Sequence, residues 1–429
     1  MRNFDRVIIG NSAAGIGAIE GLLSQGDSGK GSTCLVSEEN HPAYSRPFIG
    51  HLVDGSRSIE ELYYRPSEFY RRRGLVYMGG RLATHLDLED GIVELDGGEM
   101  LGFRKLLIAT GGSPIVPPIP GLGQNSYSFM KISDAEDLMK RLEGEGAKSA
   151  VILGGGLIGA AATAALLERG VETTIVELAP RILSSVLDED ASSLIQSELD
   201  ARGVRTVTGH TISRVDGDRL GPISTLDSGE VIDSDLLVVA IGVQPRAELA
   251  MDAGIEVDRG IIVNRRMETS VPGVYAAGDC AQVYDSLREK SMVLALWPTA
   301  YMGGRVAGRN MAGGNAELEW STSMNSMNYF GKSVLSAGIV NSPEGGGWDE
   351  IIENKEGSYR KIITRGGVLK GFVLVGDVEK AGLYLQMMRG KTDIDKLSKS
   401  PLDEDFGLIH LPTMERRRIL KEAVRVAGH

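Results

Sequence analysis

The chain of 429 residues is 42% hydrophobic and carries a net charge of −12, and its length predicts about three domains of roughly 150 residues. The acidic balance argues against non-specific binding to nucleic acid, and two distant cysteines, Cys34 and Cys280, argue against a disulfide framework and for a reducing, cytoplasmic setting. No apolar run reaches the about 20 residues of a membrane span, and the first strand begins too early to leave room for a signal peptide, so we expect a soluble intracellular protein.

The first predicted unit, residues 7–38, has the order strand, glycine turn, helix, strand and acid. A pyrophosphate needs backbone N–H groups aimed at it, no side chain in the way and a helix N-terminus that supplies partial positive charge. Gly10 permits the tight turn, Gly15 lets the helix pack closely on the strand, and the small Ser12 replaces the usual second glycine. Glu38 ends the second strand, where a carboxylate can accept hydrogen bonds from a ribose diol; a packing turn without a ligand is the alternative. The positions expected to contact a nucleotide are Gly10, Ser12, Ala13, Ala14 and Gly15.

The second predicted unit, residues 150–177, repeats this design with a complete glycine pattern. Glu177 follows the third glycine at close to the interval expected of a dinucleotide-binding unit. A carboxylate there favours the free 2′-hydroxyl of NADH and repels a 2′-phosphate, whereas Arg181 keeps NADPH as the less favoured alternative. A doubly wound unit without a dinucleotide also stays open. The positions expected to contact the nucleotide are Gly154, Gly156, Leu157, Ile158 and Gly159.

Each unit is followed later in the chain by a further apolar strand that ends in a turn of small residues. This strand spans residues 106–108 for the first unit and 236–239 for the second. The prolines between 114 and 120 predict a stiff linker between domains. From about residue 320, short alternating runs predict an antiparallel sheet with helices, and residues 414–426 predict a final helix. The predicted fold class is α/β, with two doubly wound dinucleotide-binding (Rossmann-like) domains and a C-terminal α+β domain.

Five further motifs give the chain a resemblance to the pyridine-nucleotide–flavin oxidoreductases, above all to rubredoxin and ferredoxin reductases, NADH oxidases and the flavoprotein part of nitrite reductases. The motifs lie at residues 44–47, 109–114, 240–245, 269–280 and 297–300. The resemblance implies FAD in the first site and a pyridine nucleotide in the second. It also implies a discontinuous FAD-binding domain, an NAD-binding domain and a C-terminal interface domain with an extra tail. Their respective expected bounds are 1–115 with 240–318, 116–239, and 319–429.

The same resemblance suggests roles for single residues in the FAD site. Asp279 follows a strand and Gly278, so its carboxylate can face the ribitol hydroxyls. Arg46 can meet the FAD pyrophosphate, with a bland surface arginine as the alternative, and Pro47 fixes the chain near the flavin edge. The helix that opens near Ala300 is expected to aim its N-terminus at the flavin ring, where negative charge gathers. The remaining positions expected to contact a cofactor are Leu82, Ala109, Thr110, Gly111, Gly242 and Trp297.

The redox cysteines of many relatives are missing from this chain. Residues 44–52, where single-cysteine relatives place theirs, contain none, and Cys34 and Cys280 are expected to be small core residues. We therefore disfavour the reduction of disulfides, peroxides and coenzyme A disulfide. Relatives often carry glutamate where Ala161 stands, which leaves the contacts to the nicotinamide side open. No catalytic side chain is assigned, because hydride transfer from nicotinamide to flavin needs only stacking at near-attack distance, and no metal site is predicted.

The sequence thus predicts a FAD-dependent NAD(P)H:acceptor oxidoreductase that passes electrons from NADH to a carrier protein such as rubredoxin or ferredoxin. The alternatives are the NADH-linked flavin subunit of a multi-subunit iron–sulfur or metal oxidoreductase, an NADH oxidase, and a non-catalytic module that senses NADH. The acceptor, the direction and the oligomeric state stay open.

The final helix carries a basic cluster opposite apolar residues. On so acidic a protein, this cluster could dock an acidic electron carrier or a partner subunit, although a solvated helix face is the favoured alternative. The basic residues are Arg416, Arg417, Arg418, Lys421 and Arg425, opposite Ile419, Leu420, Ala423 and Val424.

Overall fold

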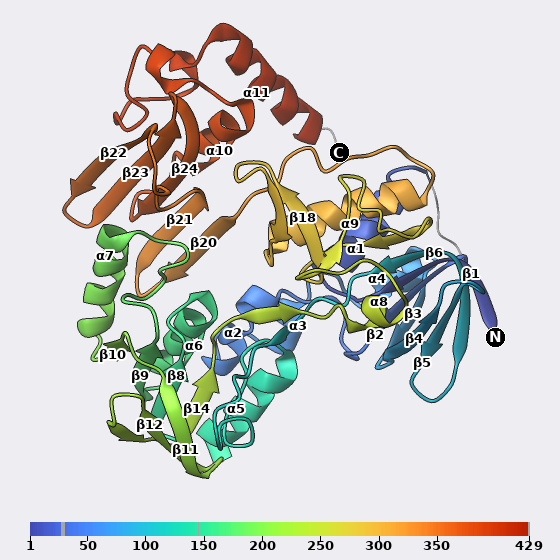
Figure 1. Ribbon diagram of the computed structural model, residues 1–429, viewed down its shortest axis with the longest axis horizontal. Helices are drawn as coiled ribbons and strands as arrows, with labels where there is room; N and C mark the ends of the chain where they lie inside the picture. Colours follow the sequence, from blue (N-terminus) through green and yellow to red (C-terminus); the bar gives the residue numbers. More distant parts are fainter. Residues whose placement is uncertain (27–30, 145, 428–429) are drawn as a thin grey trace.

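The computed structural model describes residues 1–26, 31–144 and 146–427, and the chain forms three lobes (Figure 1). The first lobe contains a seven-stranded sheet in the order β3-β2-β1-β6-β5-β4, in which β17 also pairs with β6. Strands β3, β2, β1 and β6, together with β17, run parallel to one another. β4 and β5 form an antiparallel hairpin at the edge of the sheet. The strands of this sheet are β1 (Arg2–Ile9), β2 (Thr33–Ser37), β3 (Val76–Gly79), β4 (Ala83–Asp87), β5 (Ile92–Leu95), β6 (Met100–Ile108) and β17 (Val274–Ala276).

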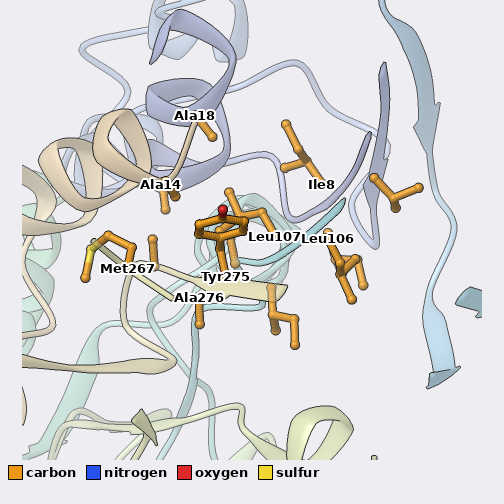
Figure 2. Packing of buried hydrophobic residues seen from close by; sticks show 14 of the residues in the cluster. Ile8, Ala14, Ala18, Leu106, Leu107, Met267, Tyr275 and Ala276 are labelled. Carbon is orange, nitrogen blue, oxygen red and sulfur yellow. The ribbon is translucent and has the colours of Figure 1, made fainter. Parts of the chain in front are cut away.

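Two helices, α1 (Ala13–Leu23) and α9 (Trp297–Met311), pack backbone to backbone on this sheet. A Cβ at Gly304 would overlap the carbonyl oxygen of Ala14, and a Cβ at Gly308 would overlap that of Ala18. Only glycine at these positions lets the two helices approach so closely. Figure 2 shows the core beneath them, where Met267 and Tyr275 pack with the buried strand residues. The beginning and the end of the first lobe are thereby joined in one core, although they lie far apart in the sequence.

The second lobe is built on a parallel sheet in the order β10-β9-β8-β14, with an antiparallel sheet of β11, β12 and β13. Gly170 has φ +72° just after α6, as expected of a glycine that ends a helix. β7 (Gly112–Pro114) and β15 (Val243–Pro245) pair with each other where the chain enters and leaves this lobe. The remaining elements of the lobe are β8 (Ser149–Leu153), β9 (Glu172–Glu177), β10 (Arg205–Thr208), β11 (Ile212–Asp218), β12 (Gly221–Leu226), β13 (Val231–Asp233), β14 (Leu236–Val239), α5 (Ile132–Gly144), α6 (Leu157–Glu168) and α7 (Glu189–Asp200).

The third lobe is a five-stranded antiparallel sheet in the order β20-β21-β24-β23-β22. Tyr359 and Val373 join the core of the second lobe, whereas Ile362 and Phe372 join a core with α10. The sheet is therefore covered on both faces. Its elements are β20 (Met324–Tyr329), β21 (Lys332–Gly338), β22 (Trp348–Lys355), β23 (Ser358–Arg365), β24 (Val368–Val375), α10 (Ala381–Gly390) and α11 (Thr413–Ala427).

Short elements connect the lobes and complete the fold. Within the described ranges, no helix is both long and apolar enough to cross a bilayer. The predicted fold class is confirmed, and the predicted domain bounds stay a prediction. The short elements are η1 (Arg46–Phe48), α2 (Gly50–Val53), α3 (Ile59–Leu62), α4 (Glu68–Arg72), α8 (Glu248–Asp252), β16 (Ile261–Ile262), β18 (Ala281–Asp285), β19 (Lys290–Val293), η2 (Ile394–Lys396) and η3 (Leu408–His410).

The basic cluster of the final helix is partly engaged in the fold. Arg416 donates to the carbonyl of Ile409 (3.2 Å), and Arg418 donates to that of Gln386 (3.1 Å). On the apolar side of this helix, Ile419 is buried, whereas Leu420 is 50% exposed. The side chains of Ala423, Val424 and Arg425 lie outside the part of the chain that the structure describes.

Candidate dinucleotide-binding sites

The first glycine turn joins β1 to α1 in a conformation that other residues would not tolerate. Gly10 has φ +116°, and a Cβ there would overlap the carbonyl oxygen of Ala109 at the end of β6. A Cβ at Gly15 would overlap the carbonyl of Gly10. Ser12 is the N-cap of α1 in extended conformation, and among the described residues no side chain caps the helix and no acid lies in its first turn. The N-terminal N–H groups of α1 are therefore available to an anion.

The second glycine turn joins β8 to α6 and repeats this geometry. Gly154 has φ +113° and lies against Ala240, and a Cβ at Gly159 would overlap the carbonyl of Gly154. Gly156 is the N-cap, and a Cβ on it would meet no described atom within 4 Å. Protein packing therefore does not explain the glycine at this position, whereas close approach of a ligand does. Leu157 and Ile158 form the first turn of α6, which likewise has no side-chain cap or acid in the described structure.

Glu38, the acid after β2, is held by two cations that come from distant parts of the chain. Its carboxylate contacts Arg246 Nη1 at 2.6 Å and Lys131 Nζ at 3.3 Å. Burial alone would raise the pKa of Glu38, but the hydrogen bond and charge of Arg246, with those of Lys131, lower that pKa below its ordinary value. Glu38 is thus a fixed anion at the end of the strand, and sequence reasoning missed both partners. Arg246 directly follows the 240–245 motif, which could have drawn attention to it.

Glu177, the acid after β9, is turned back onto its own glycine loop. Its two carboxylate oxygens accept hydrogen bonds from the N–H of Gly155 (2.5 Å) and of Ala179 (2.7 Å). Because a carboxylate has about four acceptor positions, it can still accept from a ribose hydroxyl. Arg181 lines a cavity of about 360 Å³ between α7 and β10.

Asp279 and Arg46 lie near each other at the first site. Burial raises the pKa of Asp279, and the positive charge of Arg46 opposes that rise. Within the described ranges, the Asp279 carboxylate accepts no hydrogen bond from a protein group, so it suits hydroxyl donors of a ligand such as ribitol. Arg46 pairs with Glu39 and donates to the carbonyl of Met130 (3.2 Å). Arg46 is therefore held by protein contacts and is not a freely solvated surface arginine.

The N-terminus of α9 is a third open helix end. Pro298 lies in its first turn, and no described side chain caps it. The hydroxyl of Thr299 is buried without a hydrogen-bond partner in the described structure, and so is that of Tyr64, whose ring packs edge-on against Trp297 at 5.1 Å. Orphaned hydroxyls of this kind fit a polar ligand at this helix end. Tyr64 belongs to no motif, and sequence reasoning missed it.

The other expected positions are distributed around these turns. Ala109, Thr110 and Gly111 follow β6, and the Thr110 hydroxyl donates to the carbonyl of Arg246 (2.6 Å). Ala13 and Ala14 open α1, Ala300 lies in the first turn of α9, and Gly278 follows β17. Gly242 lies between β14 and β15 with φ +121°. Pro47 in η1 is exposed, and Leu82 before β4 is 39% exposed. That each of these residues contacts a cofactor stays a prediction.

Neither cysteine is placed for redox chemistry. Cys34 and Cys280 are both free and buried, and burial raises the pKa of Cys34 to about 12. Because thiolates are the reactive form, neither thiol is poised for reaction near neutral pH. In the described part of the chain, no group of three or more His, Cys, Asp or Glu side chains is placed to hold a metal ion.

Two successive doubly wound units with open helix ends define a protein that binds two dinucleotides. Residues 4–304 match the family described as pyridine nucleotide-disulphide oxidoreductase, and the chain belongs to this family. Residues 324–392 match the rubredoxin NAD+ reductase C-terminal domain. Membership makes the chain an NAD(P)H oxidoreductase and a flavoprotein, with FAD and a pyridine nucleotide as cofactors.

Individual relatives agree with this assignment. The chain is 32% identical over 394 residues to the NADH-dependent phenylglyoxylate dehydrogenase subunit epsilon of Aromatoleum evansii, covering 91% of this chain and 93% of that protein. It is 29% identical over 407 residues to nitrite reductase (NAD(P)H) of Bacillus subtilis, covering 94% of this chain but only 49% of that protein. The solved water-forming NADH oxidase of Lactobacillus brevis, bound to NADH, superposes with a TM-score of 0.85 at 18% identity over 100% of both chains, which supports the fold alone.

Proposed function

We propose that this chain is an NADH:acceptor oxidoreductase that delivers electrons to a separate electron-carrier protein. The observation that carries the proposal is the pair of glycine turns, each opening onto an uncapped helix end. FAD, when bound, supplies a redox centre that accepts two electrons at once and can release them singly. Both described thiols are buried and unpaired, so the chain offers no dithiol as acceptor, and this supports an acceptor outside the chain. The same thiols support a cytoplasmic location.

In the first site, the chain's residues bind and orient FAD. The N-terminus of α1 would hold the pyrophosphate, Glu38 would accept from the ribose, and Asp279 would accept from the ribitol hydroxyls. Arg46 balances the charge of Asp279. The N-terminus of α9 would offer partial positive charge to the bound group, and the buried hydroxyl of Thr299, which has no partner in the described structure, lies in the first turn of the same helix.

In the second site, the residues favour NADH over NADPH. The N-terminus of α6 holds the pyrophosphate, and the fixed carboxylate of Glu177 accepts from the free 2′-hydroxyl of the adenosine ribose. A 2′-phosphate at this position would meet that carboxylate as a like charge.

A second candidate function is the NADH-linked flavin subunit of a multi-subunit oxidoreductase. It is favoured by the relative from Aromatoleum evansii, which is named as a subunit and which the chain covers almost completely. Co-purification with a partner that contains iron would support the subunit, whereas a homogeneous chain that reduces a free carrier would support the carrier reductase.

The test is an anaerobic titration of the FAD-loaded protein with NADH and then NADPH, followed by rubredoxin, ferredoxin and oxygen as acceptors. We expect NADH to bleach the flavin absorbance at lower concentration than NADPH, and an iron–sulfur or rubredoxin-type carrier to restore it. Rapid reoxidation by oxygen without a carrier would instead identify an NADH oxidase. A protein that stays colourless with ample FAD would contradict the proposal.

A further inference from the structure

A cavity of about 520 Å³ lies where the turn between β18 and β19 meets the third lobe. None of its lining residues belongs to either glycine turn, to Asp279 or to the start of α9. Its volume falls in the range of about 300–1,000 Å³ that is typical of small-molecule sites. Its walls come from the β18–β19 turn, the segment before β22, and strands β22 to β24.

The wall from the first lobe is fixed by a buried charge. Arg288 donates to Asp285 (2.8 Å), whose side chain is fully buried, and to the carbonyl of Gly338 at the end of β21 (3.1 Å). These bonds tie the turn to the sheet of the third lobe. The next residue, Glu289, has φ +54°, a conformation that residues other than glycine adopt at some cost. Lys290 follows it and also lines the cavity.

The charges at the cavity favour an anion. Lys290 from β19 and Lys370 from β24 form no ion pair with any described residue, although the molecule is acidic overall. Arg288 and Arg365 also line the cavity, against two acids, Glu289 and Glu344. The basic side chains outnumber the acidic ones, and they come from the β18–β19 turn and from strands β19, β23 and β24.

The lining also includes an aromatic ring and a glycine loop with exposed backbone. Trp348 lines the cavity, and the guanidinium of Arg365 lies 5.3 Å from the centre of its ring. Leu287 and Ile339 contribute apolar surface. A Cβ at Gly345 or at Gly346 would meet no described atom within 4 Å, and in the described structure neither N–H donates a backbone hydrogen bond. Unpaired N–H groups in a glycine-rich loop are well suited to phosphate oxygens.

We propose that this cavity is a nucleotide-binding site, separate from the FAD and NADH sites. The base lies against Trp348, and the phosphates bind Lys290, Lys370 and the backbone of the Gly345–Gly346 loop. An aromatic ring with cations close by is the combination that recognises a base joined to phosphate. The proposal does not depend on the nature of the electron acceptor.

The test is calorimetric titration of the FAD-loaded protein, kept saturated with NAD⁺ so that the second glycine turn is filled, using ATP and inorganic pyrophosphate as probes. We expect one ATP site, and about 10-fold weaker binding of pyrophosphate, which lacks the base. Lys290→Gln and Lys370→Gln should each weaken ATP binding by about 10-fold. Lys396→Gln, which removes an exposed lysine of the same lobe outside the cavity, should leave binding unchanged. ATP should also quench tryptophan fluorescence in the original chain but not in the Trp348→Phe variant.

Three results would overturn this proposal: no ATP binding at millimolar concentration, ATP binding by both lysine variants that is as tight as that of the original chain, or loss of ATP binding once NAD⁺ saturates the protein. Equal affinity for pyrophosphate and ATP would overturn the assignment of a nucleotide. Thermal melting of each variant checks that it is folded, so a lost signal reports on the site. The anaerobic titration with NADH reads out the proposed function separately, since none of these variants touches a glycine turn.

Discussion

At the scale of single residues, Glu177 is the position at which nucleotide preference can be changed. We expect Glu177→Ala to lower kcat/KM for NADH by about 10- to 100-fold, because a hydrogen bond to a charged group contributes about 1.5–3 kcal/mol. The kcat/KM for NADPH should fall less than that for NADH, or rise, because the variant no longer places a carboxylate against the negatively charged 2′-phosphate. Steady-state kinetics with both nucleotides checks this. Glu172→Ala, at the exposed start of the same strand, is the control, and an unchanged ratio of NADH to NADPH would contradict the role.

The lowered pKa of Glu38 makes the stability of the fold depend on pH. Because the pKa of Glu38 is lowered in the folded chain, its ion pairs stabilise the fold above the unfolded pKa, and this stabilisation is lost as the pH falls through the folded pKa. We expect Glu38→Gln to melt at a lower temperature than the original chain at pH 7, and the difference to narrow below about pH 4.5. Melting temperatures measured from pH 7 down to pH 3.5 check this. A difference that widens on acidification would refute the assignment.

At the scale of elements, the contact between α1 and α9 depends on glycine. We expect Gly308→Ala to destabilise the fold by about 1–3 kcal/mol, because its Cβ would overlap the backbone of Ala18. Gly382→Ala, in α10, is the matched control: a Cβ there meets no described atom within 4 Å, so alanine should stabilise by about 0.5–1 kcal/mol. Denaturant unfolding of both variants checks the pair. Equal effects would mean that the close packing is not what requires glycine.

The elements themselves could largely be predicted from local patterns. The helix through Leu23 and the glycine end of α6 follow from apolar runs and glycines, which act over a few residues. The partners of Glu38 could not be predicted in this way, because Lys131 and Arg246 reach it from segments that only the fold brings together. The same holds for Tyr64, which carries no periodic signal and gains its place beside Trp297 only in the folded chain.

At the scale of the whole molecule, the sequence pattern predicted three folding units but not how the third one contacts the second. Besides the shared apolar core, the contact contains a buried polar cluster. The hydroxyl of Tyr359 donates to Asp188 at 2.6 Å, and Lys361 lies 3.0 Å from Asp188 and 2.9 Å from Glu350. Asp188 also accepts from Ala191 and thereby caps α7. A lone aspartate and lysine in such distant segments look like surface residues in a sequence, because only the packed lobes remove them from water.

This cluster makes the contact between the lobes sensitive to one charge. We expect Lys361→Met to destabilise the protein by about 3–5 kcal/mol, because it leaves the carboxylate of Asp188 buried without its cation. Lys355→Met, on the exposed end of β22, should change stability by no more than about 0.5 kcal/mol. Adding Asp188→Asn to Lys361→Met should recover part of the loss, because asparagine still caps the helix but carries no charge. Unfolding curves of the three variants check this order, and if Lys361→Met proved as mild as Lys355→Met, the cluster would not be what joins the second and third lobes.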